Sequence, residues 1–260
     1  MSFSQDWLAL RAGFDAAARS PDLELRLATW AAVRTAASGR PLAVVDLGAG
    51  SGNNRRHLAP RLKLPQSWTL VDADPALLAA ARRDAPDVAV CEADLATDLA
   101  SVILPDTDLV TASALIDLVS EVWLQHLLAR VDAVGATLLV VLSYNGRATW
   151  QPSDALDDRV LDLVNRHQRT DKGFGPALGP DAGPTLARLA GDRLVQADSD
   201  WIVEPRDATM RRALADGWAA AACEMAPGEA DAIDAWRLRS HDRPARIVVG
   251  HVDQLVTPPA

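Results

Sequence analysis

The stretch that decides the fold is Pro41-Leu-Ala-Val-Val-Asp-Leu-Gly-Ala-Gly-Ser-Gly-Asn-Asn54. Its apolar run over residues 42–45 contains β-branched side chains and predicts a buried parallel strand. An acidic residue follows, and glycines then occupy every second position: Asp46, Gly48, Gly50 and Gly52. Alternate glycines let a backbone turn tightly and let a ligand approach it closely. Because open α/β sheets bind ligands where their strands end, we expect a ligand site at this turn.

Segments with strand and helix patterns alternate along the rest of the chain. Expected strands cover residues 42–47, 68–72, 87–92, 108–113, 136–142, a part of 193–203, and 245–253. Expected helices cover residues 4–19, 21–38, 53–62, 75–84, 120–134, 154–165, 206–224 and 229–240. This alternation predicts an α/β fold with a doubly wound, mostly parallel sheet of seven strands and an N-terminal helical cap.

The domain organisation follows from the same pattern. We expect one domain over residues 1–260, with a helical cap at 1–40 and a ligand-binding core at 41–143. Residues 144–190 are rich in glycine, proline and polar side chains, and they are expected to form an insertion on the substrate side. Residues 191–260 complete the sheet with C-terminal strands and helices.

Composition restricts the class of protein. The formal net charge of −9 argues against a nucleic-acid-binding protein, which usually presents a basic face. The two cysteines, Cys91 and Cys223, lack metal-ligand spacing, so we expect reduced thiols and no metal. The N-terminus has no signal-peptide pattern, and no apolar run is long enough to span a membrane. These features predict a cytoplasmic protein that acts without a membrane partner.

The opening stretch resembles motif I of the class I S-adenosylmethionine-dependent methyltransferases, whose usual form is Asp/Glu-x-Gly-x-Gly-x-Gly. All four defined positions match, and the resemblance extends over residues 42–142. It implies a Rossmann-like methyltransferase fold with S-adenosylmethionine as cofactor. It further implies that the cofactor lies along the loop formed by Asp46, Gly48, Ala49, Gly50 and Gly52.

A dinucleotide site is the main alternative for this loop. The dinucleotide fingerprint is G-x-G-x-x-G, in which the third glycine permits close packing of helix on strand. Counted from Gly48 or from Gly50, that third position is Asn53 or Arg55. A nicotinamide-dependent oxidoreductase therefore fits less well than a methyltransferase. A protein that binds S-adenosylmethionine without catalysis is the other alternative.

Two further acidic residues follow the second and third expected strands. Asp72, next to Ala73, can accept hydrogen bonds from both ribose hydroxyls, and the resemblance implies this role. Asp74 competes for it, but Asp74 followed by Pro75 is typical of a helix N-cap. At Asp94, the resemblance implies an acceptor for the adenine amine. It also places the backbone of Ala93 or Leu95 near the ring and Ser113 near the methionine end of the cofactor.

The methyl acceptor is expected to lie among residues of two segments. Asp117, in the loop after the fourth strand, either faces the substrate or caps the helix that follows Ser120. Arg166 and Arg169 form a basic cluster with Lys172 and are candidates to clamp a carboxylate or phosphate. His167 is a candidate general base, because the pKa of histidine lies near neutral pH. This segment is equally compatible with a solvated loop.

Tyr144 follows the fifth strand and is a candidate to line the acceptor pocket. Trp7 and Arg11 on the first helix are candidates to close over the cofactor.

The sequence therefore predicts a methyltransferase that acts on a small molecule, with an anionic metabolite as one acceptor that the arginine cluster would suit. An acceptor carboxylate would be oriented by Arg166 and Arg169 and would need no base. An acceptor hydroxyl or amine would give His167 or Asp117 a larger role. The identity of the acceptor and the oligomeric state do not follow from the sequence.

Overall fold

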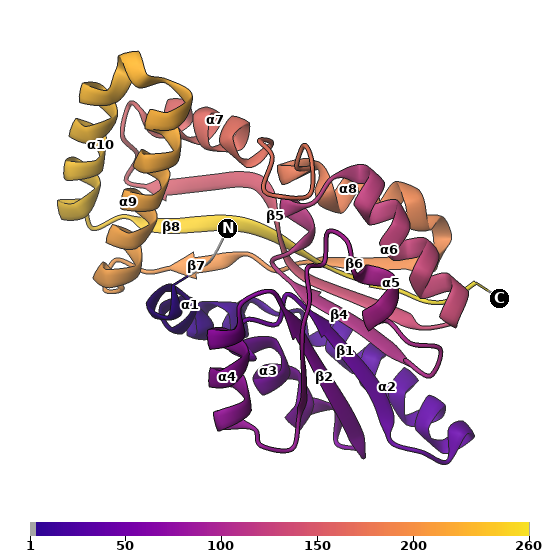
Figure 1. Ribbon diagram of the computed structural model, residues 1–260. Helices are drawn as coiled ribbons and strands as arrows, with labels where there is room; N and C mark the ends of the chain where they lie inside the picture. Colours follow the sequence, from indigo (N-terminus) through magenta and orange to yellow (C-terminus); the bar gives the residue numbers. More distant parts are fainter. Residues whose placement is uncertain (1–3, 260) are drawn as a thin grey trace.

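A computed structural model describes residues 4–259, which form one sheet with helices on both faces (Figure 1). The strand order is β3-β2-β1-β4-β5-β8-β6, and β7 also pairs with β8. The strands are β1 (Leu42–Leu47), β2 (Gln66–Asp72), β3 (Ala89–Glu92), β4 (Leu109–Ser113), β5 (Thr137–Gln151), β6 (Leu194–Asp198), β7 (Trp201–Val203) and β8 (Arg246–Val256). The first five strands are mutually parallel, whereas β8 runs antiparallel to β5, β6 and β7. The predicted doubly wound, mostly parallel sheet is confirmed.

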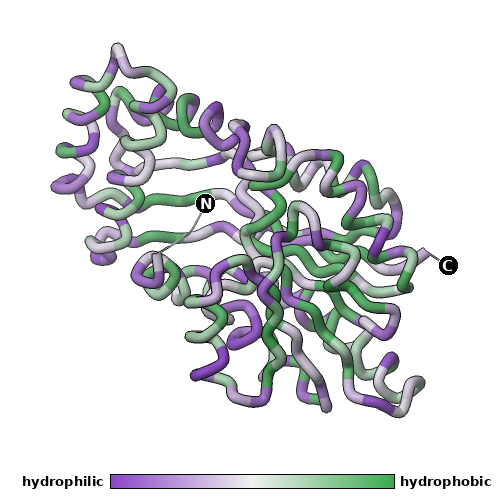
Figure 2. Tube along the Cα trace, in the orientation of Figure 1, coloured by the Kyte–Doolittle hydropathy of each residue, from purple (hydrophilic) through white to green (hydrophobic). Residues whose placement is uncertain are grey.

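The helices divide between the two faces of the sheet. They are α1 (Gln5–Ala18), α2 (Pro21–Ser38), α3 (Asn53–Leu62), α4 (Pro75–Asp84), α5 (Leu99–Val102), α6 (Glu121–Val134), α7 (Asp157–Gln168), α8 (Ala182–Ala190), α9 (Ala208–Met225) and α10 (Ala230–Asp242). Leu42 and Val44 of β1 join an apolar cluster with α2, α3 and α4. Val45 and Leu47 join a separate cluster with α5, α6 and α8. Successive side chains of a strand point to opposite faces, so one buried strand supplies both cores. The apolar strands run between these two helix layers (Figure 2).

Local capping explains where several helices begin and end. The Ser20 hydroxyl accepts a hydrogen bond from Leu23 N–H, and Pro21 occupies the first turn of α2. Gly39 ends the same helix in a left-handed conformation, with φ of 67°. Ser120 caps α6 by accepting from Trp123 N–H. These signals made the helix ends predictable.

The half of the sheet that contains β5 to β8 differs from the sequence-based prediction. β5 continues to Gln151 and does not end at residue 142, so the boundary expected near residue 143 falls inside a strand. β5 pairs with β8 along most of its length, and α7, α9 and α10 lie over the part that extends beyond the core (Figure 1). The segment expected to form one strand within 193–203 is divided into β6 and β7, so the sheet has eight strands and not seven. The glycine and the polar residues at 145–147 interrupt the strand pattern, and α8 was not predicted.

A β-bulge marks the point at which β5 leaves the core. The register between β5 and β8 shifts between Val140 and Ser143, and Leu142 has a φ of 56°. The buried carboxylate of Asp253 on β8 accepts from Leu142 N–H at 2.8 Å and from Ser20 N–H at 3.0 Å. Arg19 Nε lies 3.6 Å from the same carboxylate. One side chain therefore connects β8, the bulge and the start of α2.

We predict that the Asp253→Ala variant is less stable than the wild type by about 3–5 kcal/mol in free energy of unfolding. The substitution leaves two buried N–H groups without an acceptor and removes the nearer of the two carboxylates beside the buried Arg19 guanidinium. Urea denaturation followed by tryptophan fluorescence measures this loss. Asp198→Ala, at an exposed carboxylate of β6, is the control and should change stability by less than about 0.5 kcal/mol. A loss below about 1 kcal/mol for Asp253→Ala would contradict the role given to this carboxylate.

Candidate functional site

A cavity of about 550 Å³ lies at the carboxyl ends of β1 to β4; we call it the glycine-loop cavity. Its lining comprises Leu8, Arg11, Gly48, Gly50, Asp72, Ala73, Asp74, Pro75, Leu77, Ala93, Asp94, Leu95, Ser113, Ala114, Leu115, Leu118, Lys172, Gly173 and Phe174. Seven of the ten residues predicted to contact the cofactor are in this set. The other three, Asp46, Ala49 and Gly52, do not line the cavity.

The loop between β1 and α3 forms one wall of the cavity. Gly48 and Gly50 have φ values of 63° and 53°, in the left-handed region that side chains other than glycine rarely adopt. A Cβ atom at Gly48 would lie 3.3 Å from Leu115 Cδ1, so the side chain of Leu115 leaves little room for any side chain at this position. The loop thus presents the backbone of these two glycines to the cavity.

Asp46 supports the loop from below and does not line the cavity. Its side chain is fully buried, and Oδ1 accepts a hydrogen bond from Asn54 Nδ2 at 2.8 Å. Arg19 Nη1 in turn donates to Asn54 Oδ1 at 2.8 Å. Burial raises the pKa of the Asp46 carboxyl to about 7. The prediction that Asp46 contacts the cofactor directly is therefore not supported, since its buried position restricts it to a structural role.

Asp72 stands at the end of β2 and faces the glycine loop. Its Oδ2 accepts from Gly50 N–H at 2.8 Å, and its Oδ1 accepts from Asp74 N–H at 2.9 Å. Each carboxylate oxygen has two lone pairs, so both oxygens retain the capacity to accept from a ligand hydroxyl. Asp74 instead caps α4, accepting from Ala76 N–H and Leu77 N–H. The geometry favours Asp72 over Asp74 as the ligand-binding acid.

The third wall follows β3 and carries Asp94 and Leu95. Asp94 is exposed, and its Oδ1 accepts from Ala96 N–H at 2.9 Å, which leaves the other oxygen for a ligand. The Leu95 carbonyl accepts from Trp123 Nε1 at 2.6 Å, and this bond fixes the strand end against α6. Phe174 packs edge-on against Trp123, with ring centroids 5.6 Å apart, and contributes an aromatic face that the sequence did not reveal.

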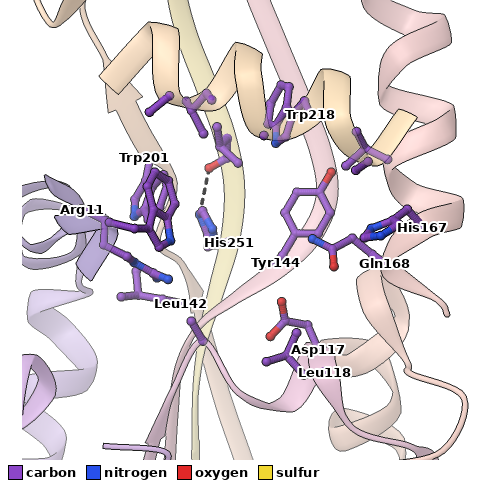
Figure 3. Close-up of a pocket in the computed structure, with 18 of the residues that line it drawn as sticks. Arg11, Asp117, Leu118, Leu142, Tyr144, His167, Gln168, Trp201, Trp218 and His251 are labelled. Atoms are coloured by element: carbon purple, nitrogen blue, oxygen red, sulfur yellow. Dashed lines mark hydrogen bonds between the residues drawn. The ribbon is translucent and has the colours of Figure 1, made fainter. Parts of the chain in front are cut away.

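A second cavity, of about 290 Å³, lies beside the first, between the core and the extended part of β5 and β8. We call it the aromatic pocket, because Trp7, Tyr144, Trp201 and Trp218 contribute to its walls (Figure 3). The two cavities share four lining residues: Arg11, Ala114, Leu118 and Lys172. A molecule in one cavity therefore lies next to a molecule in the other.

Asp117 lies in a short 3-10 turn (Ile116–Leu118) and lines the aromatic pocket (Figure 3). Its side chain is buried, and no described group forms a hydrogen bond with Oδ1. Burial raises the pKa of this carboxyl to about 6. The alternative in which Asp117 caps α6 is wrong, because Ser120 supplies that cap.

The predicted arginine clamp does not reach either cavity. Arg166 is exposed on α7, and the exposed Arg169 pairs with Asp181 at 2.9 Å. Both point away because α7 turns its apolar face, including Val164, toward the pocket. His167 does line the pocket, but its Nε2 lies 3.1 Å from Glu224 Oε2.

Other polar groups of the pocket already have partners. Arg11 pairs with Asp15 at 2.9 Å, and its guanidinium lies 5.0 Å from the centre of the Trp201 ring. The Tyr144 hydroxyl donates to Asn165 Oδ1 at 2.8 Å, so it acts as a wall residue held in place from α7. Burial lowers the pKa of His251 to about 3, and this imidazole is neutral at physiological pH.

The sequence did not identify Trp201, Trp218 or His251 as pocket residues. They come from β7, α9 and β8, which are distant in the chain and meet only through pairing and packing in the extended sheet. A tryptophan in an amphipathic segment indicates burial but not which cavity it lines. Trp150, which follows Tyr144 on β5, packs against Trp218 and Trp236.

Comparisons with known proteins agree with this geometry. Residues 44–136 match the family described as "Methyltransferase domain". Residues 44–136 therefore form the methyltransferase domain that the glycine motif predicted. The match covers β1 to the end of α6, which includes most of the glycine-loop cavity. S-adenosylmethionine is the methyl donor of this family.

Two individual proteins illustrate the relationship. Trans-aconitate 2-methyltransferase of Klebsiella pneumoniae (strain 342) is 35% identical over 142 residues, which are 54% of this chain and 51% of that protein. The chain thus aligns with about half the length of this curated relative. The structure of a cyclopropane-fatty-acyl-phospholipid synthase-like protein from Lactobacillus casei ATCC 334 has a TM-score of 0.52 at 17% identity, covering 95% of this chain and 98% of that one. The second comparison supports the fold.

Residues 4–259 contain no group of three or more His, Cys, Asp or Glu side chains placed to hold a metal ion. None of the helices within residues 4–259 is both long and apolar enough to cross a membrane.

We predict that Asp117→Asn changes the pH dependence of stability. The folded-state pKa of about 6 lies above the usual value of 3.8, so the wild type loses stability as pH rises between these values. The asparagine removes this loss, and the variant should gain about 2 kcal/mol relative to wild type on going from pH 4 to pH 8. Chemical denaturation at both pH values measures the difference. The contribution of Asp46 to the pH dependence is the same in both proteins and drops out of the comparison. A difference that is independent of pH would contradict the burial of an unpaired carboxylate.

Proposed function

We propose that this protein transfers a methyl group from S-adenosylmethionine, bound in the glycine-loop cavity, to a small molecule bound in the aromatic pocket. The observation that carries the proposal is the wall that the two cavities share. Methyl transfer requires donor and acceptor to be held in contact and in line, and adjoining cavities provide this arrangement. The pocket volume of about 290 Å³ suits a small molecule and not a macromolecule.

The residues of the glycine-loop cavity fit the cofactor in their chemistry. Asp72 offers carboxylate oxygens to the ribose hydroxyls, and Asp94 offers one to the adenine amine. Gly48 and Gly50 let the ligand lie against bare backbone, and Ser113 lines the same cavity next to Ala114 of the shared wall. The cofactor carries a sulfonium and an ammonium group, so acidic walls favour its binding. When bound, it supplies a methyl group on a positively charged sulfur.

The contribution of the chain to the reaction is alignment, exclusion of water and control of a proton. Leu8 and Arg11 on one side and Phe174 on the other cover the glycine-loop cavity, and the indole rings enclose the acceptor. A strong base is not required, since transfer from a sulfonium is favourable. Asp117 is better placed than His167 to accept a proton, because its neighbour Leu118 lines both cavities.

An anionic acceptor receives less support from the geometry than from the sequence. The relative from Klebsiella pneumoniae is named for trans-aconitate, and the basic segment near residue 166 suggested an anion clamp. However, Arg166 and Arg169 lie outside the pocket, and Arg11 is paired with Asp15. Lys172, whose ammonium donates to Thr170 at 2.9 Å, is the remaining cation at the shared wall.

We predict that Asp72→Ala weakens binding of S-adenosylhomocysteine by about 1–3 kcal/mol, or roughly 5- to 150-fold in Kd. The variant loses the acceptor for two ribose hydroxyls and the anchor of the Gly50 amide. Isothermal titration calorimetry measures the affinity. Asp87→Ala is the matched control, because this aspartate is exposed at the start of the β3 region and lies outside the cavity.

The same titrations test the alternatives. Binding of NADH without binding of S-adenosylmethionine would overturn the proposed function in favour of an oxidoreductase. Unchanged affinity in Asp72→Ala would contradict the role of this residue. Tight cofactor binding with no methyl transfer to any compound in a metabolite pool would favour a binding protein without catalysis.

A further inference from the structure

We propose that the acceptor is a small amine with an apolar or aromatic body, and that its nitrogen binds to Asp117. The inference rests on the proposed function and specifies its substrate class. It is carried by an unpaired buried carboxylate in a pocket whose walls are largely aromatic rings.

The first observation is the state of Asp117. The residue is 7% exposed, and Oδ1 has no hydrogen-bond partner among the described residues. In Figure 3 the carboxylate points into the pocket beneath Tyr144. A buried acceptor atom without a partner costs free energy, which a ligand with an N–H or O–H group repays. A carboxylate ligand has neither group when ionised and would add repulsion.

The second observation is the composition of the walls. The rings of Trp7, Trp201, Trp218 and Tyr144 border the pocket. The face of an aromatic ring carries partial negative charge, so indoles attract an ammonium group more strongly than a neutral hydroxyl. The rings and Asp117 together therefore favour an amine over an alcohol.

The positively charged groups of the pocket are directed elsewhere. Arg11 forms its ion pair with Asp15 and contacts the Trp201 ring, and its charge partly offsets the rise that burial causes in the pKa of Asp117. His167 contacts Glu224, and Lys172 contacts Thr170 and His167. His251 is neutral and lies against Val249 O through Nδ1, at 3.0 Å. Among the buried side-chain nitrogen and oxygen atoms of the described pocket residues, Asp117 Oδ1 is thus the one without a hydrogen-bond partner.

In this role Asp117 also accepts the proton that the amine must lose before it is methylated. The acceptor enters as an ammonium ion and passes one proton to the Asp117 carboxylate, which leaves a nitrogen lone pair. That lone pair forms the new N–C bond as the C–S bond breaks and its electron pair stays on sulfur. The product is a methylated ammonium ion, and Asp117 afterwards releases its proton to solvent. Burial favours this step, because it raises the affinity of the carboxyl for a proton.

The experiment compares an aromatic amine with an alcohol and a carboxylate of similar shape, and with the tricarboxylate trans-aconitate. Protein loaded with S-adenosylhomocysteine is titrated calorimetrically with 2-phenylethylamine, 2-phenylethanol, 3-phenylpropionate and trans-aconitate. We expect the amine to bind at least about tenfold more tightly than the other three. Asp117→Asn should remove this preference and leave the affinity for S-adenosylhomocysteine unchanged. Asp181→Asn, at an exposed carboxylate outside the pocket, is the control and should behave as the wild type.

Three results would overturn the proposal: stronger binding of either anion, no preference for the amine, or an unchanged amine preference in Asp117→Asn. Retained binding of S-adenosylhomocysteine shows that the variant is folded. An amine preference that depends on Asp117 in a protein that does not bind S-adenosylhomocysteine would support the amine site and overturn the proposed function. The two proposals therefore fail separately.

Discussion

The architecture of this protein depends on the buried carboxylate of Asp253. It accepts the amide of Leu142 at the bulge of β5 and the amide of Ser20 at the start of α2, and it faces Arg19. Without an acceptor inside the structure, a left-handed residue at the centre of a buried strand would leave its N–H group unpaired. The bulge allows β5 to leave the parallel core and continue as part of an extended antiparallel sheet. Every wall of the aromatic pocket beyond Leu142 follows from that continuation.

The same junction explains why the two cavities adjoin. α1 ends at Ala18, just before the segment that Asp253 anchors, so the junction fixes the end of the helix that carries Trp7 and Arg11. Leu142 itself lines the aromatic pocket. From the opposite side, the turn after β4 contributes Ala114 and Leu118 to both cavities. The shared wall is therefore made of elements whose positions are set by the sheet and by one polar contact.

The cofactor half could be predicted from the sequence because its signals are local. The alternate glycines, the acid after β2 and the Asp-Pro cap at residue 74 each reflect a backbone requirement within a few residues. The acceptor half depends on contacts between segments that are far apart in the chain. Trp201 and His251 meet with ring centroids 4.9 Å apart through pairing of β7 with β8, and no local pattern encodes that pairing. The arginine clamp was wrong for a related reason, since local composition does not say which face of α7 is buried.

Two buried aspartates near the carboxyl ends of the strands differ in role, one structural and the other suited to bind a ligand. Asp46 and Asp117 are both buried, and burial raises the pKa of each. Asp46 is held by Asn54, which Arg19 holds in turn, and it borders neither cavity. The free energy lost by burying the Asp46 carboxyl is offset by the hydrogen bonds that support the glycine loop. Asp117 has no such network and opens onto a space of molecular size. A destabilising carboxylate in that position is explained by a ligand that pairs with it, and the aromatic walls around it indicate a cation.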